Sequence, residues 1–132
     1  IAKKITNPEN SDIIKETETR RRVISVETSE TITRMLVKVV DEALVGGTVS
    51  MPHYSIAAKT GTAQIPKKDG NGYSDEYLHS FFGYAPAFDP KFLIFLYLEK
   101  PQGVRYASQS LTPLFMDNIK FLLNYHEVPP DR

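Results

Sequence analysis

The spacing of apolar residues near the start of the chain is typical of β-strands. Residues 1–6 and 13–24 are strand-like, and the segment between them is rich in Asn, Pro, Ser and Asp, which favour turns. The first 24 residues therefore predict a β-hairpin. An arginine cluster at residues 20–22 has Glu16 and Glu18 beside it, so a solvated, salt-bridged strand face is favoured over a phosphate-binding patch.

The spacing becomes helical after this hairpin. Ser25 is a suitable N-cap and Glu27 is favourable in the first turn, while Gly46 and Gly47 are suited to a helix end. A helix is therefore expected over residues 25–45. Its apolar positions recur with the period of one helix face, and they are Ile32, Met35, Leu36, Val39, Val40 and Ala43.

Three strand-like segments follow between residues 55 and 100. The connections between them are short, which predicts an antiparallel sheet. The last segment, residues 92–98, is apolar on both faces, as in a central strand that helices cover on both sides. These segments and the flanking helices predict an α+β fold: an antiparallel sheet of about three main strands covered by helices, with the N-terminal hairpin in addition.

A final helix is expected over residues 108–126. Pro113 is tolerated in its first turn, and Pro129 and Pro130 end it. The apolar residues expected to face inward are Leu111, Leu114, Phe115, Ile119, Leu122 and Leu123.

Composition excludes several classes of function. In 132 residues, 16 Lys and Arg balance 16 Asp and Glu, so no overall field attracts nucleic acid. Cysteine is absent, which removes thiolate nucleophiles and thiolate metal ligands. His53, His79 and His126 are too scattered to form a known metal-ligand spacing, so neither a metal nor a cofactor is expected. The chain starts at Ile1 without an initiator methionine, which suggests a segment of a longer polypeptide.

The sequence Lys59-Thr60-Gly61-Thr62 carries the candidate chemistry. Lys59 offers a positive charge, Thr60 and Thr62 offer hydroxyls that can bind a carboxylate, and Gly61 permits close approach of another backbone. Together they predict an anion-binding edge that orients an acyl group. The alternative is an ordinary solvated strand lysine between threonines of high β-propensity.

Several separate segments resemble one family, the class B penicillin-binding proteins. Besides residues 56–64, they are residues 22–25, 46–48, 80–86 with Asp89 and Pro90, 99–103 and 113–115. The resemblance implies a partial β-lactamase/transpeptidase-like fold and a peptidoglycan DD-transpeptidase activity. Residues 72–81 and 124–130 are similar to those of the division-specific type.

The resemblance also implies residue roles. Lys59 would lie near the serine of an upstream Ser-x-Asn motif and assist proton transfer and electrostatics around the nucleophile. Thr60 and Thr62 would bind the terminal carboxylate of a D-Ala-D-Ala stem peptide or a β-lactam, and Gly61 would let the substrate strand lie close. The backbone N–H of Thr62 would form half of the oxyanion hole. Members of this family often have aromatic residues in the short segment before the last helix, so the resemblance also makes Tyr106 a candidate for substrate binding.

Two motifs of that family are missing from these residues. No Ser-x-x-Lys and no Ser-x-Asn occurs in the 132 residues, and acyl transfer needs an activated serine. We therefore expect residues 1–132 to be the C-terminal part of a transpeptidase domain, inactive alone and completed by its N-terminal remainder. The parent protein is expected to be extracytoplasmic and anchored by an N-terminal transmembrane helix.

Two other functions remain open at this point. A penicillin-sensing receptor domain would use the same acylation chemistry to signal. A non-catalytic structural or interaction fragment would self-associate through apolar faces that the missing elements leave uncovered.

Overall fold

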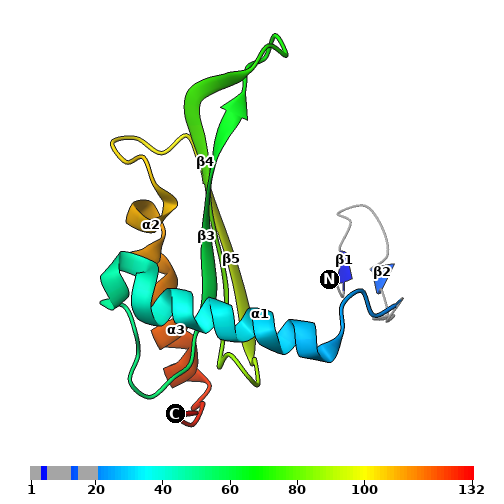
Figure 1. Ribbon diagram of the computed structural model, residues 1–132, viewed down its shortest axis with the longest axis vertical. Helices are drawn as coiled ribbons and strands as arrows, with labels where there is room; N and C mark the ends of the chain where they lie inside the picture. Colours follow the sequence, from blue (N-terminus) through cyan, green and yellow to red (C-terminus); the bar gives the residue numbers. More distant parts are fainter. Residues whose placement is uncertain (1–3, 6–12, 15–20) are drawn as a thin grey trace.

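The computed structural model describes residues 4–5, 13–14 and 21–132 (Figure 1). The helices and strands follow in the order β1 (Lys4–Ile5), β2 (Ile13–Ile14), α1 (Val26–Lys38), β3 (Ala57–Pro66), β4 (Tyr73–Ala85), β5 (Phe92–Glu99), α2 (Ala107–Ser110) and α3 (Thr112–Tyr125). Between α1 and β3 the chain makes a π-helical turn, Val39–Ala43, and a 3-10 turn, Leu44–Gly47.

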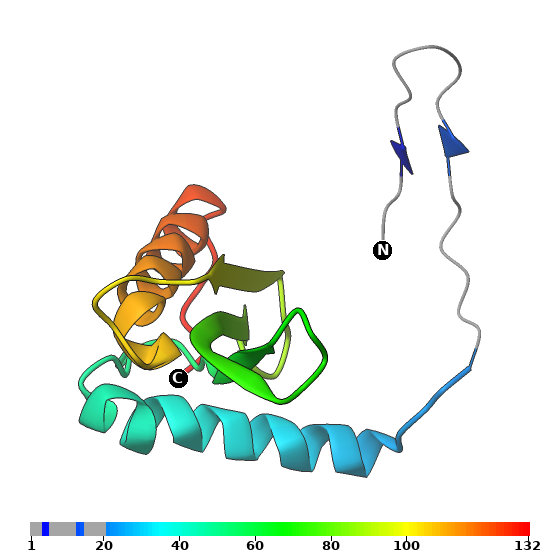
Figure 2. The same cartoon turned by 90° about the horizontal axis from the view of Figure 1, so that it is seen from above.

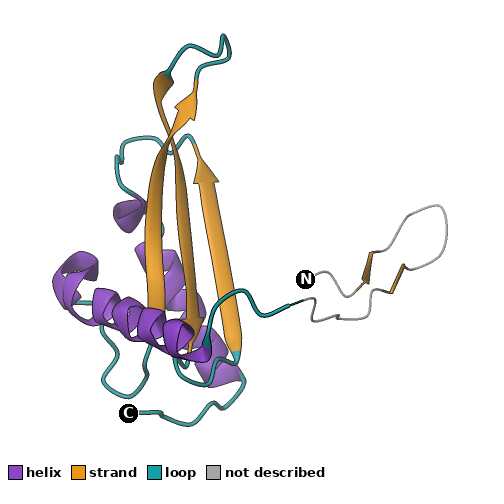
Figure 3. Ribbon diagram, turned by 45° about the vertical axis from the view of Figure 1, so that its right-hand side comes forward, coloured by secondary structure: helices purple, strands orange, loops and turns teal. Residues whose placement is uncertain are grey.

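The sheet that organises the fold has three antiparallel strands in the order β3-β4-β5. The helix α1 crosses one face of this sheet, and α3 packs on the other (Figure 2). The β3–β4 hairpin extends beyond the end of β5 (Figure 3). This arrangement confirms the predicted α+β class and the antiparallel sheet covered by helices.

The main core lies between the sheet and α3. Phe81 of β4 and Phe115 of α3 are fully buried, and their rings stack with centroids 4.3 Å apart. The close packing requires a glycine at Gly83, because a Cβ atom there would lie 2.4 Å from the Phe115 ring and 2.8 Å from Ala58 Cβ. The ring therefore fixes the position of β4 and, through it, the register of β3.

The helix α1 begins as the sequence predicts. The Ser25 side chain accepts a hydrogen bond from the Thr28 backbone N–H at 3.0 Å. The α-helix ends at Lys38, and the two further turns lead to Val45, Gly46 and Gly47, all of which have positive φ.

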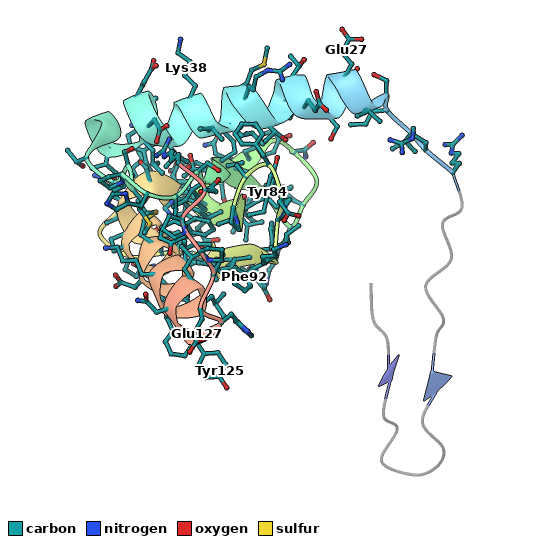
Figure 4. All side chains as sticks on the ribbon, turned by 90° about the horizontal axis from the view of Figure 1, so that it is seen from below. Glu27, Lys38, Tyr84, Phe92, Tyr125 and Glu127 are labelled. Atoms are coloured by element: carbon teal, nitrogen blue, oxygen red, sulfur yellow. The ribbon has the colours of Figure 1, made fainter. Side chains whose placement is uncertain are left out.

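The predicted inner face of this helix is wrong in part. Ile32 and Met35 are exposed, whereas Thr33, Val40 and Leu44 are buried. The Thr33 hydroxyl lies 2.8 Å from the Tyr84 hydroxyl of β4. Figure 4 shows Glu27 and Lys38 projecting from the outer side of α1, with Tyr84 on its inner side. The helix contacts the narrow three-strand sheet with only part of its apolar stripe, so the rest of the stripe is exposed.

Two further expectations are corrected by the structure. In the described sheet β5 is an edge strand and β4 is central, so the central place predicted for residues 92–98 is wrong there. Their alternate side chains Leu93, Phe95 and Tyr97 are 60–67% exposed. On the last helix Leu114 is exposed, and Met116 and Thr112 take part in the buried side instead.

The N-terminal hairpin is described at four positions. Lys4 pairs with Ile14 and Ile5 with Ile13, in antiparallel register. Residues 21–24 of the predicted hairpin are described and form no strand, so that part of the prediction is wrong, and the remaining positions of residues 1–24 lie outside the described residues. Among the described helices, none has both the length and the apolar character to span a membrane. Nor does the described part of the chain bring together three or more His, Asp or Glu side chains around a possible metal ion.

Candidate functional site

The strand β3 carries the candidate site and forms an edge of the described sheet. Lys59 pairs with Phe82, Thr60 with Phe81, Gly61 with Ser80 and Thr62 with His79. Side chains alternate along a strand, and directly paired residues share a face. Thr60 and Thr62 therefore lie on the face that α2 and α3 cover, whereas Lys59 lies on the face that α1 crosses.

Lys59 is exposed, and its ammonium group donates a hydrogen bond to the Thr60 carbonyl at 2.8 Å. An ammonium group has three donors, so two remain for an anionic partner or a neighbouring hydroxyl. This geometry agrees with an electrostatic role and places the charge beside the edge of β3.

The hydroxyl of Thr62 makes a long-range contact. Its Oγ1 accepts a hydrogen bond from the backbone N–H of Ala107, the first residue of α2, at 3.0 Å. Because a hydroxyl has a single hydrogen, this contact leaves Thr62 as a donor toward any ligand at the edge of β3. Thr60 is half-buried two residues earlier on the same face. The two threonines therefore share one face of β3.

Gly61 lies between the threonines and opposite Ser80. A Cβ atom at this position would lie 2.5 Å from Ser80 Oγ, and no other neighbour would come closer than 3.9 Å. The conflicting atom ends a rotatable side chain. The backbone at Gly61 is therefore accessible to close approach, and the internal packing demands glycine much less strongly here than at Gly83.

The C-terminal segment holds the start of β3, and no motif or periodicity in the sequence predicts this contact. The carboxylate of Asp131 accepts hydrogen bonds from Ser55 N–H at 2.7 Å and from Ser55 Oγ. The Ser55 carbonyl in turn accepts the Ala87 N–H at 2.9 Å. Ser55, which lies shortly before β3, is thus joined to the C-terminal segment and to the loop that contains Ala87.

A second contact of the same segment joins Arg132 to Asp41. The guanidinium group donates to both carboxylate oxygens, at 2.6 and 2.8 Å, and to the Met51 carbonyl at 2.7 Å. The hydrogen bond from Arg132 holds the pKa of Asp41 below its ordinary value, against the opposing effect of partial burial. We call the contacts of Asp131 and Arg132 the C-terminal clasp.

The remaining candidate residues lie apart from one another. His53 and His126 are exposed, whereas His79 is completely buried. Tyr106 is exposed next to Ala107, and the Arg105 guanidinium lies 5.7 Å from its ring centroid. Tyr106 directly precedes Ala107, whose N–H group binds Thr62, so Tyr106 lies near Thr62. Tyr84 lies under α1, on the opposite face of the sheet.

The chain is similar to known proteins in sequence and in structure. The family model of the penicillin binding protein transpeptidase domain matches residues 1–120. Penicillin-binding protein PbpB of Mycolicibacterium smegmatis is 40% identical over 117 residues, which are 82% of this chain and 18% of that protein. Stage V sporulation protein D of Bacillus subtilis is 35% identical over 105 residues, covering 78% of this chain and 16% of that protein.

Solved structures give the same result. The apo crystal structure of penicillin binding protein 3 from Mycobacterium tuberculosis matches with a TM-score of 0.73 and 30% identity, over 98% of this chain and 31% of that one. Its complex with ampicillin matches with a TM-score of 0.72 at 30% identity, over 97% and 30% of the two chains. The chain thus spans less than a fifth of the length of these two curated relatives. Since the family model covers most of the chain and its sheet and helices superpose on such a structure, the chain belongs to the penicillin-binding protein transpeptidase domain family.

Proposed function

We propose that residues 1–132 are the C-terminal part of the transpeptidase domain of a class B penicillin-binding protein. The parent protein would cross-link peptidoglycan stem peptides and be acylated by β-lactams. The observation that carries this proposal is the edge strand β3, which presents Lys59 on one face and Thr60 and Thr62 on the other, with Gly61 between them. Family membership and the relatives named above as penicillin-binding proteins support it.

Each site residue has a chemical role in this proposal. Thr60 and Thr62 donate hydrogen bonds to the terminal carboxylate of the stem peptide or the β-lactam. The backbone N–H of Thr62 donates to the oxygen of the attacked carbonyl, where negative charge develops in the transition state. Lys59 lowers the energy of negative charge near the nucleophilic serine and assists its proton transfer. Gly61 allows the extended substrate to lie against β3.

The nucleophile is proposed to lie in the N-terminal remainder of the same domain, because these 132 residues contain no Ser-x-x-Lys and no Ser-x-Asn. We expect a fluorescent penicillin to label the longer polypeptide covalently and to leave the 132-residue chain unlabelled. Labelling of the short chain would disprove the upstream nucleophile. A folded longer polypeptide that resists labelling would disprove the transpeptidase function.

Lys59→Ala tests the site within the longer polypeptide. Removing one electrostatic contributor to an acyl-transfer site typically costs on the order of 10²-fold in rate. We expect that loss in the acylation rate by penicillin, measured by the appearance of the labelled band with time. Lys38→Ala is the matched control, since Lys38 is an exposed lysine on the outer side of α1 (Figure 4). Acylation of Lys59→Ala at the unsubstituted rate would remove Lys59 from the mechanism.

The remainder of the domain is also the proposed occupant of the uncovered sheet face. A groove of about 420 Å³ lies between α1 and the sheet, with Thr33, Tyr84 and Leu93 among its lining residues. Phe95 and Tyr97 continue the apolar surface along β5, whose outer edge no strand of the described residues pairs. The matched solved structure has more than three times the length aligned with this chain, which is enough to supply this cover.

We further propose an extracytoplasmic location for the parent, on the side of the membrane where peptidoglycan is assembled, with an N-terminal transmembrane anchor. A division-specific role is proposed on the resemblance of residues 72–81 and 124–130. A fusion of the parent to a reporter that is active only outside the cytoplasm would test the location. Inactivity of that reporter, with the fusion intact, would contradict it.

The alternative function is a non-catalytic fragment that self-associates. The observation in its favour is the same uncovered apolar surface on β5, since large exposed apolar patches generally mark interaction sites.

A further inference from the structure

The buried histidine of the sheet has no role in the function proposed above. His79 is completely buried on β4, directly paired with Thr62 of β3. Its Nε2 atom lies 3.0 Å from the Arg105 carbonyl oxygen, and its Nδ1 atom lies 2.8 Å from Ser110 Oγ. Both ring nitrogens thus bind the segment 105–110, which contains α2.

One of these hydrogen bonds has a direction fixed by its partner. A carbonyl oxygen only accepts, so the Nε2 atom of His79 carries a hydrogen and donates it to Arg105. The Nδ1 atom and the Ser110 hydroxyl form the second hydrogen bond. One side chain therefore holds the segment at two points on either side of Ala107.

Ala107 is the residue whose N–H group donates to Thr62 Oγ1 at 3.0 Å. It is completely buried, so it has little room to shift if the flanking contacts remain. The path from His79 to Thr62 thus consists of three hydrogen bonds around one short segment, and it ends on a hydroxyl proposed to contact substrate.

We propose that His79 is a positioning residue that sets the direction of the Thr62 hydroxyl. With Ala107 N–H donating to Thr62 Oγ1, the hydroxyl hydrogen points away from α2 and is available to an anionic group at the edge of β3. Without His79 the segment 105–110 loses both anchors, and the hydroxyl can turn to donate toward the backbone or solvent. This inference rests on the proposed function of Thr62 as a carboxylate ligand.

The test uses the longer polypeptide with four variants. His79→Phe removes both hydrogen bonds and keeps a planar ring. His79→Gln retains a side-chain N–H that can reach the Arg105 carbonyl, and Ser110→Ala removes the other bond alone. His53→Phe is the matched control, because it makes the same chemical change at an exposed histidine.

The readout is the acylation rate by benzylpenicillin, which has the carboxylate, divided by the rate with its methyl ester, which does not. We expect His79→Phe to lower this ratio roughly tenfold, the effect of misaligning one charge-assisted hydrogen bond. His79→Gln and Ser110→Ala should give smaller decreases, and His53→Phe should leave the ratio unchanged. General damage to the fold would reduce both rates together and keep the ratio constant, and that result would overturn the inference.

Two further measurements separate this inference from the proposed function. Exchange of backbone amide hydrogens in residues 105–110 should become faster in His79→Phe, and unchanged exchange would show that His79 does not anchor the segment. In a Thr62→Val background, His79→Gln should no longer alter the ratio, and a persistent effect would overturn the path through Thr62.

If the unsubstituted protein acylates with acid and ester equally fast, the carboxylate role of the threonines fails and this inference fails with it. A protein that prefers the acid, with His79 variants that keep the preference, overturns the positioning role alone.

Should His79→Phe fail to fold, Ser110→Ala decides the question. Its side chain is only half-buried, and its substitution removes one anchor without placing a new group in the core. An unchanged ratio together with unchanged exchange in this variant would overturn the inference.

Discussion

Gly83 is the more tightly packed of the two glycines in the three-stranded sheet. We expect Gly83→Ala to lower the free energy of unfolding by about 1–3 kcal/mol, the usual cost of forcing an extra carbon into a filled core. The new methyl group would meet the Phe115 ring and Ala58 Cβ, neither of which can move without disturbing the core. Urea denaturation measures the change: the midpoint concentration of urea should fall while the slope of the unfolding free energy against urea concentration stays the same.

Gly61→Ala is the matched control for that measurement. It makes the same change on the neighbouring strand, where the new methyl group conflicts mainly with the rotatable Ser80 hydroxyl. Its stability should stay within about 0.5 kcal/mol of the unsubstituted chain, as for substitutions away from packed features. Equal losses in the two variants would contradict the packing described here. The same Gly61 variant should bind substrate less well if an extended ligand lies against β3.

At this scale the sequence predicts Lys59, Thr60, Gly61 and Thr62 as the candidate site, and the structure has them on the edge strand β3, with Lys59 on one face and the two threonines on the other. The partners that hold them could not be predicted. Ala107, His79 and Asp131 reach the site strand from segments that are far away in the chain, and no local motif or periodicity marks such contacts. A buried histidine looks the same in a sequence as an exposed one, so His79 stood out only as an unlikely metal ligand.

Among the elements, the C-terminal clasp makes stability depend on acidity. The pKa of Asp41 is lower in the folded chain than its ordinary value of 3.8, chiefly because Arg132 donates hydrogen bonds to it. A group whose pKa is depressed on folding stabilises the fold fully above its unfolded pKa, and that stability is lost as pH falls through the folded pKa. The contribution of this pair should therefore be present at neutral pH and decline below about pH 4.

The variant Asp41→Asn should reduce the free energy of unfolding at pH 7 by about 1 kcal/mol, since a bidentate pair exceeds the usual surface ion pair. The difference from the unsubstituted chain should shrink as the pH falls from 7 to 3, because the unfolded chain binds a proton at Asp41 more readily than the folded chain does. Asp89→Asn is the matched control, because that carboxylate is far more exposed beside Lys91. A difference that stays constant from pH 7 to pH 3 would show that the ion pair is not its cause. Thermal unfolding in a series of buffers gives the comparison.

The predicted elements differ from the observed ones for physical reasons. The helical spacing from residue 25 and the N-cap Ser25 located α1 correctly, but periodicity cannot show how wide a sheet the helix will meet. The helix therefore exposes Ile32 and Met35, which the pattern assigns to its inner face. For β5, an apolar run predicts cover on both faces, whereas the described residues supply it on one. The apolar run of β5 fits the proposal that the remainder of the domain covers its second face.

At the scale of the whole molecule, the exposed side of β5 predicts self-association of the 132-residue chain. Leu93, Phe95 and Tyr97 line one side of β5, whose outer edge is paired by no strand among the described residues, and such edges tend to pair with another chain. Replacing all three with threonine keeps the β-propensity and removes most of the apolar area. Light scattering coupled to size-exclusion chromatography should show a larger species for the unsubstituted chain and a monomer for this triple variant.

The matched control changes exposed apolar residues elsewhere. Leu114, Phe121 and Tyr125 are similarly exposed on α3, and their replacement with glutamine should leave the association unchanged. A monomer at high concentration for the unsubstituted chain would contradict the prediction. If the remainder of the domain covers this surface, the longer polypeptide should not associate through it.

The register of β3 restricts how the length of this chain can change in evolution or by engineering. Inserting one residue between Ala58 and Lys59 would move Lys59 to the face of Thr60 and reverse every later side chain of the strand. The packing of Ala58 on Gly83 fixes the strand at that end, so the reversal could not be absorbed by sliding. The turn at residues 67–72 has no such restriction, because Cβ atoms at Gly70 and Gly72 would meet no neighbour within 4 Å. Insertions and fluorescent labels should therefore be placed in that turn, where they leave Lys59 and the two threonines on their own sides of the strand.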